Sequence, residues 1–156
     1  MVEYISKDKT LHIIYKNIKD IPSYINIISD EYEGKIEDRI GLNFPMTFVY
    51  KCEKNKKISK KEAQDIKKYD IEYIIVYKKG DVMTKIHEEL HAKYYTDIEY
   101  KKKVKEYWNS LNKSSKEKVL SLLEKMKYPK DNEEILIDEF QAYFYSEKKN
   151  FFGKLD

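Results

Sequence analysis

The sequence predicts an α+β fold, in which a short three-stranded sheet packs on one helix and a second important helix follows later in the chain. Runs rich in β-branched and aromatic residues predict the three strands, at 11–15, 46–50 and 71–77. Apolar residues that recur every three or four positions predict the two helices, at about 82–95 and 133–147. A chain of 156 residues can bury one hydrophobic core, and no repeat or linker divides it, so we expect a single domain over residues 1–156.

The first third of the chain is expected to alternate strands with a helix. The segment 11–15 is β-branched and aromatic, which favours a strand. The segment 21–40 has one apolar stripe, with Pro22 in the first helical turn. Gly34 marks a possible break in this helix, and Gly41 is placed to end it.

The middle of the chain predicts a strand, a helix and a second strand. The strand at 46–50 follows Pro45, and a charged connection leads on from it. Ser59, with a glutamate three residues later, predicts a capping box for a helix that ends near residue 69. The run at 71–77 is the strongest strand signal in the chain.

The second half is expected to be helical. Asp81 can cap the helix at 82–95, and a lysine-rich helix follows at 97–111. Ser114 or Ser115 is placed to cap the next helix, and a loop containing Pro129 precedes the last one. Trp108 is expected to be a core anchor against the helix at 82–95.

The overall composition limits the function classes. The 31 basic and 28 acidic side chains nearly balance, and Arg39 is the only arginine, so general nucleic-acid binding is not expected. No apolar run reaches the roughly 18 to 20 residues that cross a bilayer. The N-terminal segment lacks the apolar core of a signal peptide, and Cys52, the only cysteine, is expected to be a small buried hydrophobe. We therefore expect a cytoplasmic or otherwise intracellular protein without membrane partners.

Two of the three histidines stand in a His-Glu-x-x-His motif, at His87 and His91, with Glu88 beside the first. On a helix, positions four apart lie on one face, so both imidazoles can point at a single ion. Glu88 then lies next to that ion as a base for a zinc-bound water. The same apolar stripe is expected to bury these histidines together with neighbours on the helix: Met83, Ile86, Leu90 and Tyr94.

A catalytic zinc site needs a third protein ligand. His12 lies far upstream on a predicted strand and is expected to be a packed or surface residue, and no cysteine follows His91. A carboxylate on the last helix is left, and Glu139 lies on its apolar stripe, where burial requires a partner. Three nearby carboxylates remain alternatives: Glu133, Glu134 and Asp138.

The two motifs together resemble the zincin metallopeptidases of the gluzincin type. The sequence has His87-Glu88-Glu89-Leu90-His91 and, about fifty residues later, Glu139-Phe140-Gln141-Ala142, which is similar to the lethal-factor and Pro-Pro-endopeptidase group and to small soluble gluzincins. The resemblance implies a small zincin-like fold. It also implies hydrolysis of peptide bonds in a peptide or protein substrate, as an endopeptidase rather than an exopeptidase.

The resemblance also implies roles for single residues. His87, His91 and Glu139 would bind Zn²⁺, Glu88 would be the general base, and Tyr128 is the candidate donor to the oxyanion. Many gluzincins have an aspartate four residues after the ligand glutamate, which orients a zinc-binding histidine. Tyr143 stands at that place here, and Asp138 is a less well directed substitute. The strand at 71–77 is the expected sheet edge for the substrate backbone.

Two other functions remain open at this stage. The chain could be a catalytically inactive zincin-fold binding or regulatory module, which would have no need of a base at Glu88. It could also be a lysine-rich nucleic-acid-associated protein with a structural metal site, in which case DNA binding would depend strongly on salt.

Overall fold

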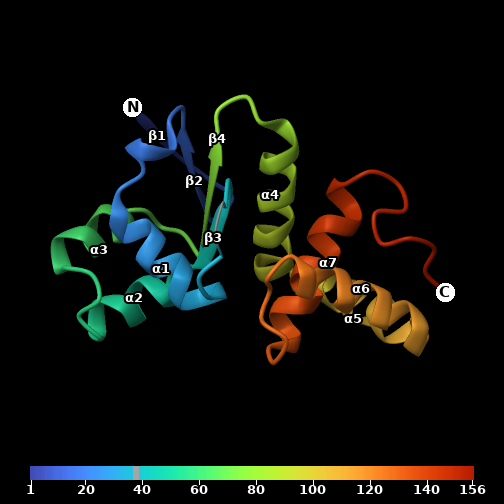
Figure 1. Ribbon diagram of the computed structural model, residues 1–156. Coiled ribbons are helices and arrows are strands. Elements are labelled where there is room, and N and C mark those ends of the chain that lie inside the picture. The colour runs from blue at the N-terminus through green and yellow to red at the C-terminus, as the bar shows by residue number, and fades with distance from the viewer. Residues whose placement is uncertain (37–38) are drawn as a thin grey trace.

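The computed structural model describes residues 1–36 and 39–156, and it has the α+β class that the sequence predicts. Figure 1 shows helix α4 (Val82–Thr96) between two parts of the molecule. On one side lies the sheet with α1 (Ser23–Glu33), α2 (Met46–Lys54) and α3 (Lys60–Lys67). On the other lie α5 (Ile98–Ser110), α6 (Lys113–Lys125) and α7 (Glu133–Ser146).

Within the described residues the sheet has four strands rather than the three expected, in the order β1-β2-β4-β3. Strand β2 (Thr10–Tyr15) pairs antiparallel with β1 (Val2–Lys7) and parallel with β4 (Tyr73–Lys78). The short strand β3 (Leu42–Pro45) pairs antiparallel with β4 and ends the sheet. The expectation that 71–77 forms the sheet edge is therefore wrong, because β4 lies inside the sheet and β3 lies at its margin.

The segment 46–50 was expected to be a strand but lies in α2. Pro45 is the N-cap of this helix, and Met46, Val49 and Cys52 recur at helical spacing on its buried side. A short apolar run fits a strand or a buried helix equally well, and here the three-residue spacing decides for the helix. Cys52 is buried as predicted, with 1% of its surface exposed.

Helix α1 ends earlier than the stripe at 21–40 predicts. It stops at Glu33, and Gly34 follows with φ +84°, a left-handed conformation that suits glycine, so the break expected at Gly34 is confirmed. The expected end at Gly41 is wrong, since Gly41 lies just before β3 and outside α1. Part of the predicted extension, at 37–38, lies outside the described residues.

Two of the predicted caps are confirmed and one is wrong. Ser59 and Glu62 form the capping box of α3, with Ser59 Oγ accepting from Glu62 N at 3.0 Å. Asp81 caps α4 by accepting from the backbone N of Thr84 at 3.1 Å. Helix α6 is capped by Asn112, not by Ser114 or Ser115, because the Asn112 side chain accepts from the backbone N of Ser115.

The hydrophobic core has two main parts, one on each side of α4. One face of the sheet packs on α1, α2 and α3 through a cluster that includes Leu11, Ile25 and Ile74. The other cluster joins α5, α6 and α7 to the C-terminal segment, with Trp108 and Phe140 at 5.1 Å between ring centroids. Helix α4 covers the second face of the sheet and also contributes Tyr94 to this cluster, so it joins both halves.

Over the described residues, no helix combines the length with the apolar character that a membrane-spanning segment requires.

Candidate metal centre

Only part of the stripe predicted on the motif helix α4 is buried, since His91 and Tyr94 are 1% and 3% exposed. Met83 and Ile86 are 48% and 40% exposed, although the apolar stripe predicts that both are buried. The residues that are buried on α4 include polar ones instead: Thr84, Glu88 and His91. The buried side of α4 therefore includes the polar residues Thr84 and Glu88, and it places the motif against α7 and β3 while Tyr94 packs into the helical cluster.

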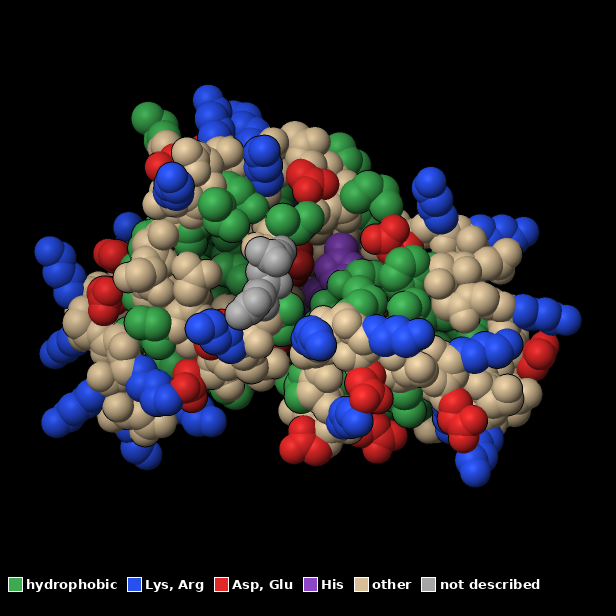
Figure 2. Space-filling view, in the orientation of Figure 1, with side chains coloured by type: hydrophobic (Ala, Val, Ile, Leu, Met, Phe, Trp, Pro, Cys, Tyr) green, Lys and Arg blue, Asp and Glu red, His purple; other side chains and the backbone are tan. Residues whose placement is uncertain are grey.

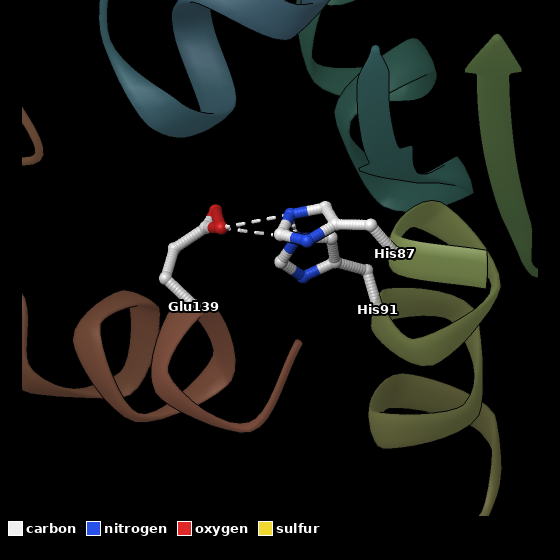
Figure 3. Close-up of side chains that lie close together, drawn as sticks. All are labelled: His87, His91 and Glu139. Atoms are coloured by element: carbon white, nitrogen blue, oxygen red, sulfur yellow. Dashed lines mark hydrogen bonds and ion pairs between the residues drawn. The ribbon is translucent and has the colours of Figure 1, made fainter. Parts of the chain in front are cut away.

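Three side chains from α4 and α7 meet at one point. His91 Nε2 lies 3.2 Å from His87 Nε2 and 3.1 Å from Glu139 Oε1, and His87 Nε2 lies 3.4 Å from the same oxygen. Figure 3 shows Glu139 reaching from α7 toward both imidazoles on α4. The three residues could hold a metal ion.

The spacing of these atoms fits a small divalent ion. Ligand atoms around a tetrahedral ion with bonds of about 2.0–2.1 Å lie roughly 3.3–3.4 Å apart, close to the 3.1, 3.2 and 3.4 Å found here. Glu139 Oε1 is also buried and accepts no hydrogen bond from any described residue, although two ring nitrogens lie within ion-pair distance. Because only the two imidazoles approach this buried oxygen, it is an atom that a cation would satisfy.

The other acidic candidates on α7 are used elsewhere. Glu134 contacts Lys101 at 2.9 Å and Lys105 at 3.0 Å, and Glu133 is exposed. Asp138 contacts the far nitrogen of a histidine, as described next. Of the carboxylates that the sequence left open, Glu139 is thus the one that the fold brings to both Nε2 atoms.

Asp138 contacts the ring nitrogen of His91 that faces away from Glu139. Its Oδ1 lies 2.8 Å from His91 Nδ1 and also accepts from Gln141 Nε2 at 2.9 Å. The expectation that Tyr143 orients a zinc-binding histidine through a hydrogen bond is wrong. Tyr143 packs its ring at 4.4 Å from the ring of His87, and its hydroxyl lies 2.8 Å from that of Tyr128.

The charges around His91 shift several pKa values in the metal-free state. Burial alone would lower the pKa of His91, but Asp138 and Glu139 raise it well above its usual value. Burial alone would raise the pKa of Glu139, but His91 and His87 lower it to about 2. The pocket therefore stabilises positive charge between these residues.

Glu88 lies beside this group but does not belong to it. It is 4% exposed, and burial raises its pKa. Its Oε2 accepts a hydrogen bond from Asn43 Nδ2 of β3 at 3.0 Å. The carboxylate is thus anchored to the edge strand rather than to α7.

Tyr128, the expected oxyanion donor, lies between α6 and α7 and lines the same cavity as the motif. Burial, together with the nearby charge of Glu139, raises its pKa, so the phenol stays protonated and can donate. His12 is not part of the site. It is half-buried on β2, with Nδ1 at 3.0 Å from the Tyr77 hydroxyl.

A cavity of about 430 Å³ is lined by the motif residues His87, Glu88 and His91 and by Tyr128, Glu139 and Tyr143. Figure 2 shows histidine side chains at the bottom of a hollow between the two halves of the molecule. The cavity walls also contain residues that the sequence did not single out as functional: Glu33, Arg39, Gly41 and Asn43. A polar Asn43 between Leu42 and Phe44 was the one sequence signal that could have pointed to β3.

No family model matches the chain, and comparisons with curated proteins and with solved structures find no match either.

Proposed function

We propose that the protein is a small zinc-dependent endopeptidase of the gluzincin type. The observation that carries the proposal is the meeting of two Nε2 atoms and Glu139 Oε1 at 3.1–3.4 Å in the cavity that Glu88 also lines. Two histidines and one carboxylate are a ligand set of catalytic zinc sites, which keep a further position open for water or substrate. His87, His91 and Glu139 would hold the ion.

A bound zinc ion would act as a Lewis acid, which lowers the pKa of a water molecule from 15.7 to about 7 and polarises the scissile carbonyl. The residues of the chain supply the proton transfers. Glu88 takes a proton from the water as the water oxygen bonds to the carbonyl carbon. Glu88 then gives that proton to the amide nitrogen as the C–N bond breaks, which leaves an amine and a carboxylic acid. The acid loses its remaining proton to the amine or to solvent.

The burial of Glu88 supports this role. Because burial raises the pKa of its carboxyl, the carboxylate is a better proton acceptor than an exposed glutamate. The Tyr128 hydroxyl is the proposed donor to the oxygen of the attacked carbonyl, where negative charge develops. A structural metal site would need neither residue.

The position of β3 supports an extended peptide as the substrate. Strand β3 ends the sheet, and Asn43 near its start and Gly41 just before it line the cavity. A substrate segment that pairs with a sheet edge binds through its backbone and continues in both directions. We therefore propose that β3, not β4, receives the peptide and that an internal bond is cut.

The proposal is tested by zinc analysis paired with a peptide-cleavage assay. The wild type should purify with, or take up, about one zinc per chain and cleave an unfolded protein substrate, and a chelator should abolish cleavage. Glu88→Gln should keep the zinc and lose cleavage. Glu139→Ala should lose both.

Two exposed residues provide matched controls. Glu89→Gln, next to the base, and Glu133→Ala, on the same helix as Glu139, should leave zinc content and cleavage unchanged. A wild type that takes up no zinc would refute the proposal. A wild type that binds zinc but cleaves no member of a broad peptide library would favour a non-catalytic binding module.

A further inference from the structure

Asn43 of β3 lies between two buried carboxylates. Its side-chain Nδ2 donates one hydrogen bond to Glu88 Oε2 and one to Glu33 Oε1, each at 3.0 Å. All three residues are nearly inaccessible, with 3%, 4% and 5% exposed for Asn43, Glu88 and Glu33. Both protons of the amide are therefore committed, one to each carboxylate.

A tyrosine fixes the orientation of this amide. The Tyr73 hydroxyl donates to Asn43 Oδ1 at 2.5 Å. Turning the amide over would place its oxygen against two carboxyl groups and would leave the Tyr73 hydroxyl without its acceptor. Only one orientation satisfies all the partners.

Glu33 is the second carboxyl group that accepts a hydrogen bond from the Asn43 amide. Arg39 NH1 lies 3.4 Å from Glu33 Oε2, and the same guanidinium donates to Ser29 Oγ and to the carbonyl of Gly34. Burying Glu33 near other carboxylates is costly, and a hydrophobic residue would make a simpler core. Burial and the nearby Glu139 raise the pKa of Glu33 well above its usual value. Its contact with Asn43 holds the amide in line with Glu88.

The backbone of the same strand segment approaches the other oxygen of Glu88. A Cβ atom added to Gly41 would lie 2.3 Å from Glu88 Oε1, far inside van der Waals contact. Among the described residues, Oε1 accepts no hydrogen bond, whereas Oε2 is held by Asn43. The two oxygens of the carboxylate therefore have different environments.

We propose that Asn43 is a positioning residue for Glu88, which holds Oε2 so that Oε1 is the oxygen that exchanges the proton with water. Tyr73 and Glu33 fix the amide, and the absence of a side chain at Gly41 leaves room for Oε1. The catalytic consequence rests on the proposed peptidase function. The contact between Asn43 and Glu88 can be tested without it.

The kinetic test uses Asn43→Ala in the full chain with zinc added. Its kcat should fall about 10- to 100-fold, a part of what a positioned base contributes, with KM within about twofold and zinc content unchanged. Asn109→Ala, an exposed asparagine on α5, is the matched control and should behave as the wild type. A higher KM or a lower zinc content, with kcat unchanged, would point to a structural role and overturn the inference.

Two further variants serve if Asn43→Ala is not recovered in folded form. Tyr73→Phe removes the donor to Asn43 Oδ1, and Gly41→Ala places a methyl group against Glu88 Oε1. Each substitution should lower kcat, with KM and zinc content nearly unchanged. Wild-type kcat in both would overturn the inference.

A spectroscopic test does not require activity. In the zinc-loaded wild type, both side-chain N–H protons of Asn43 should be shifted downfield and exchange slowly with solvent. Glu88→Ala should move one of these two protons and Glu33→Ala the other. If the wild type cleaves nothing but shows this pattern, the peptidase proposal fails and the positioning contact stands; if Glu88→Ala moves neither proton, the inference fails even when the wild type is active.

Discussion

The Nδ1 atom of His91 lies 2.8 Å from Oδ1 of Asp138, and both side chains are buried. When His91 Nε2 binds a metal ion, Nδ1 carries the proton and donates it to Asp138. This contact fixes the tautomer that a metal ion needs. Gln141 holds Asp138 in place from the next helical turn, and Tyr100 in turn donates to Gln141 at 2.6 Å.

The charge of Asp138 should therefore raise metal affinity. Asp138→Asn keeps an oxygen that can accept from His91 and Gln141 but removes the negative charge. We expect zinc affinity to fall about 10- to 100-fold, measured by competition with a chromophoric chelator. The exposed Asp131→Asn is the control, and equal affinity of the two variants would contradict the role given to Asp138.

The structure brings together the three residues that the sequence named as metal ligands, His87, His91 and Glu139, and two of the three were named from local spacing. His87, Glu88 and His91 lie within two turns of one helix, so their spacing alone places the two imidazoles together. Glu139 could be chosen because a carboxylate on an apolar stripe needs a partner. Both assignments depend on periodicity within one helix, which is the strongest signal that a single sequence offers.

The partner of His91 could not be chosen in the same way. Helix α7 is buried nearly all round in its middle, from Ile135 to Ala142, so adjacent residues both face other elements. A single apolar stripe on a helix would place the adjacent residues Asp138 and Glu139 on different faces. In the structure both carboxylates contact His91, one at each ring nitrogen. The spacing of apolar residues cannot identify the buried side of a helix that has no side exposed to solvent.

The edge strand was missed for a different reason. Strand β3 has four residues and ends at a proline, so its alternation is too short to be recognised. Its contacts with Glu88 and Glu33 join segments 45 and 10 residues apart. Such pairings depend on how the sheet and α4 pack, which local patterns do not specify.

The metal-free protein should lose stability as pH rises. The folded-state pKa of His91 is raised by Asp138 and Glu139, which outweigh the effect of burial. A group with a raised folded pKa stabilises the fold below its unfolded pKa, about 6.5 for histidine. That contribution is lost as pH rises through the folded value, so Tm in a chelator should fall above about pH 6.5.

Zinc should reverse this trend, because a metal ion binds the deprotonated imidazole. The rise in Tm on adding zinc should therefore grow over the same pH range, as measured by circular dichroism. Burial lowers the pKa of His12, so His12→Asn should keep the decline of the metal-free protein. A metal-free Tm that rises from pH 6.5 upward would show that His91 is not held in its charged form.

Removing the hydroxyl of Tyr128 should slow catalysis without affecting the metal. Tyr128→Phe loses the donor proposed for the oxyanion, which is worth about 10²- to 10³-fold in kcat in comparable sites. KM and zinc content should change little, and the exposed Tyr50→Phe is the control. If Tyr143→Phe has the larger effect on kcat, the donor is Tyr143, whose hydroxyl lies 2.8 Å from that of Tyr128.

Phe140 should couple the stability of the helical half to the metal centre. It is 1% exposed, follows Glu139 directly, and its ring packs between Trp108 and Phe152 at 5.1 and 5.6 Å. Phe140→Ala should lower the free energy of unfolding by about 3–5 kcal/mol, as measured by denaturant titration of the metal-free protein. Phe144→Ala, one turn along the same helix and 36% exposed, should cost less.

Zinc should restore part of the stability lost in Phe140→Ala. A ligand that binds only the folded state at 100 times its Kd adds about 2.7 kcal/mol, so the zinc-loaded variant should unfold at a higher denaturant concentration than the metal-free one. The gain should be smaller than in the wild type, because a looser α7 no longer holds Glu139 and Asp138 against α4. An equal gain in both proteins would mean that the position of these two carboxylates does not depend on the packing of Phe140.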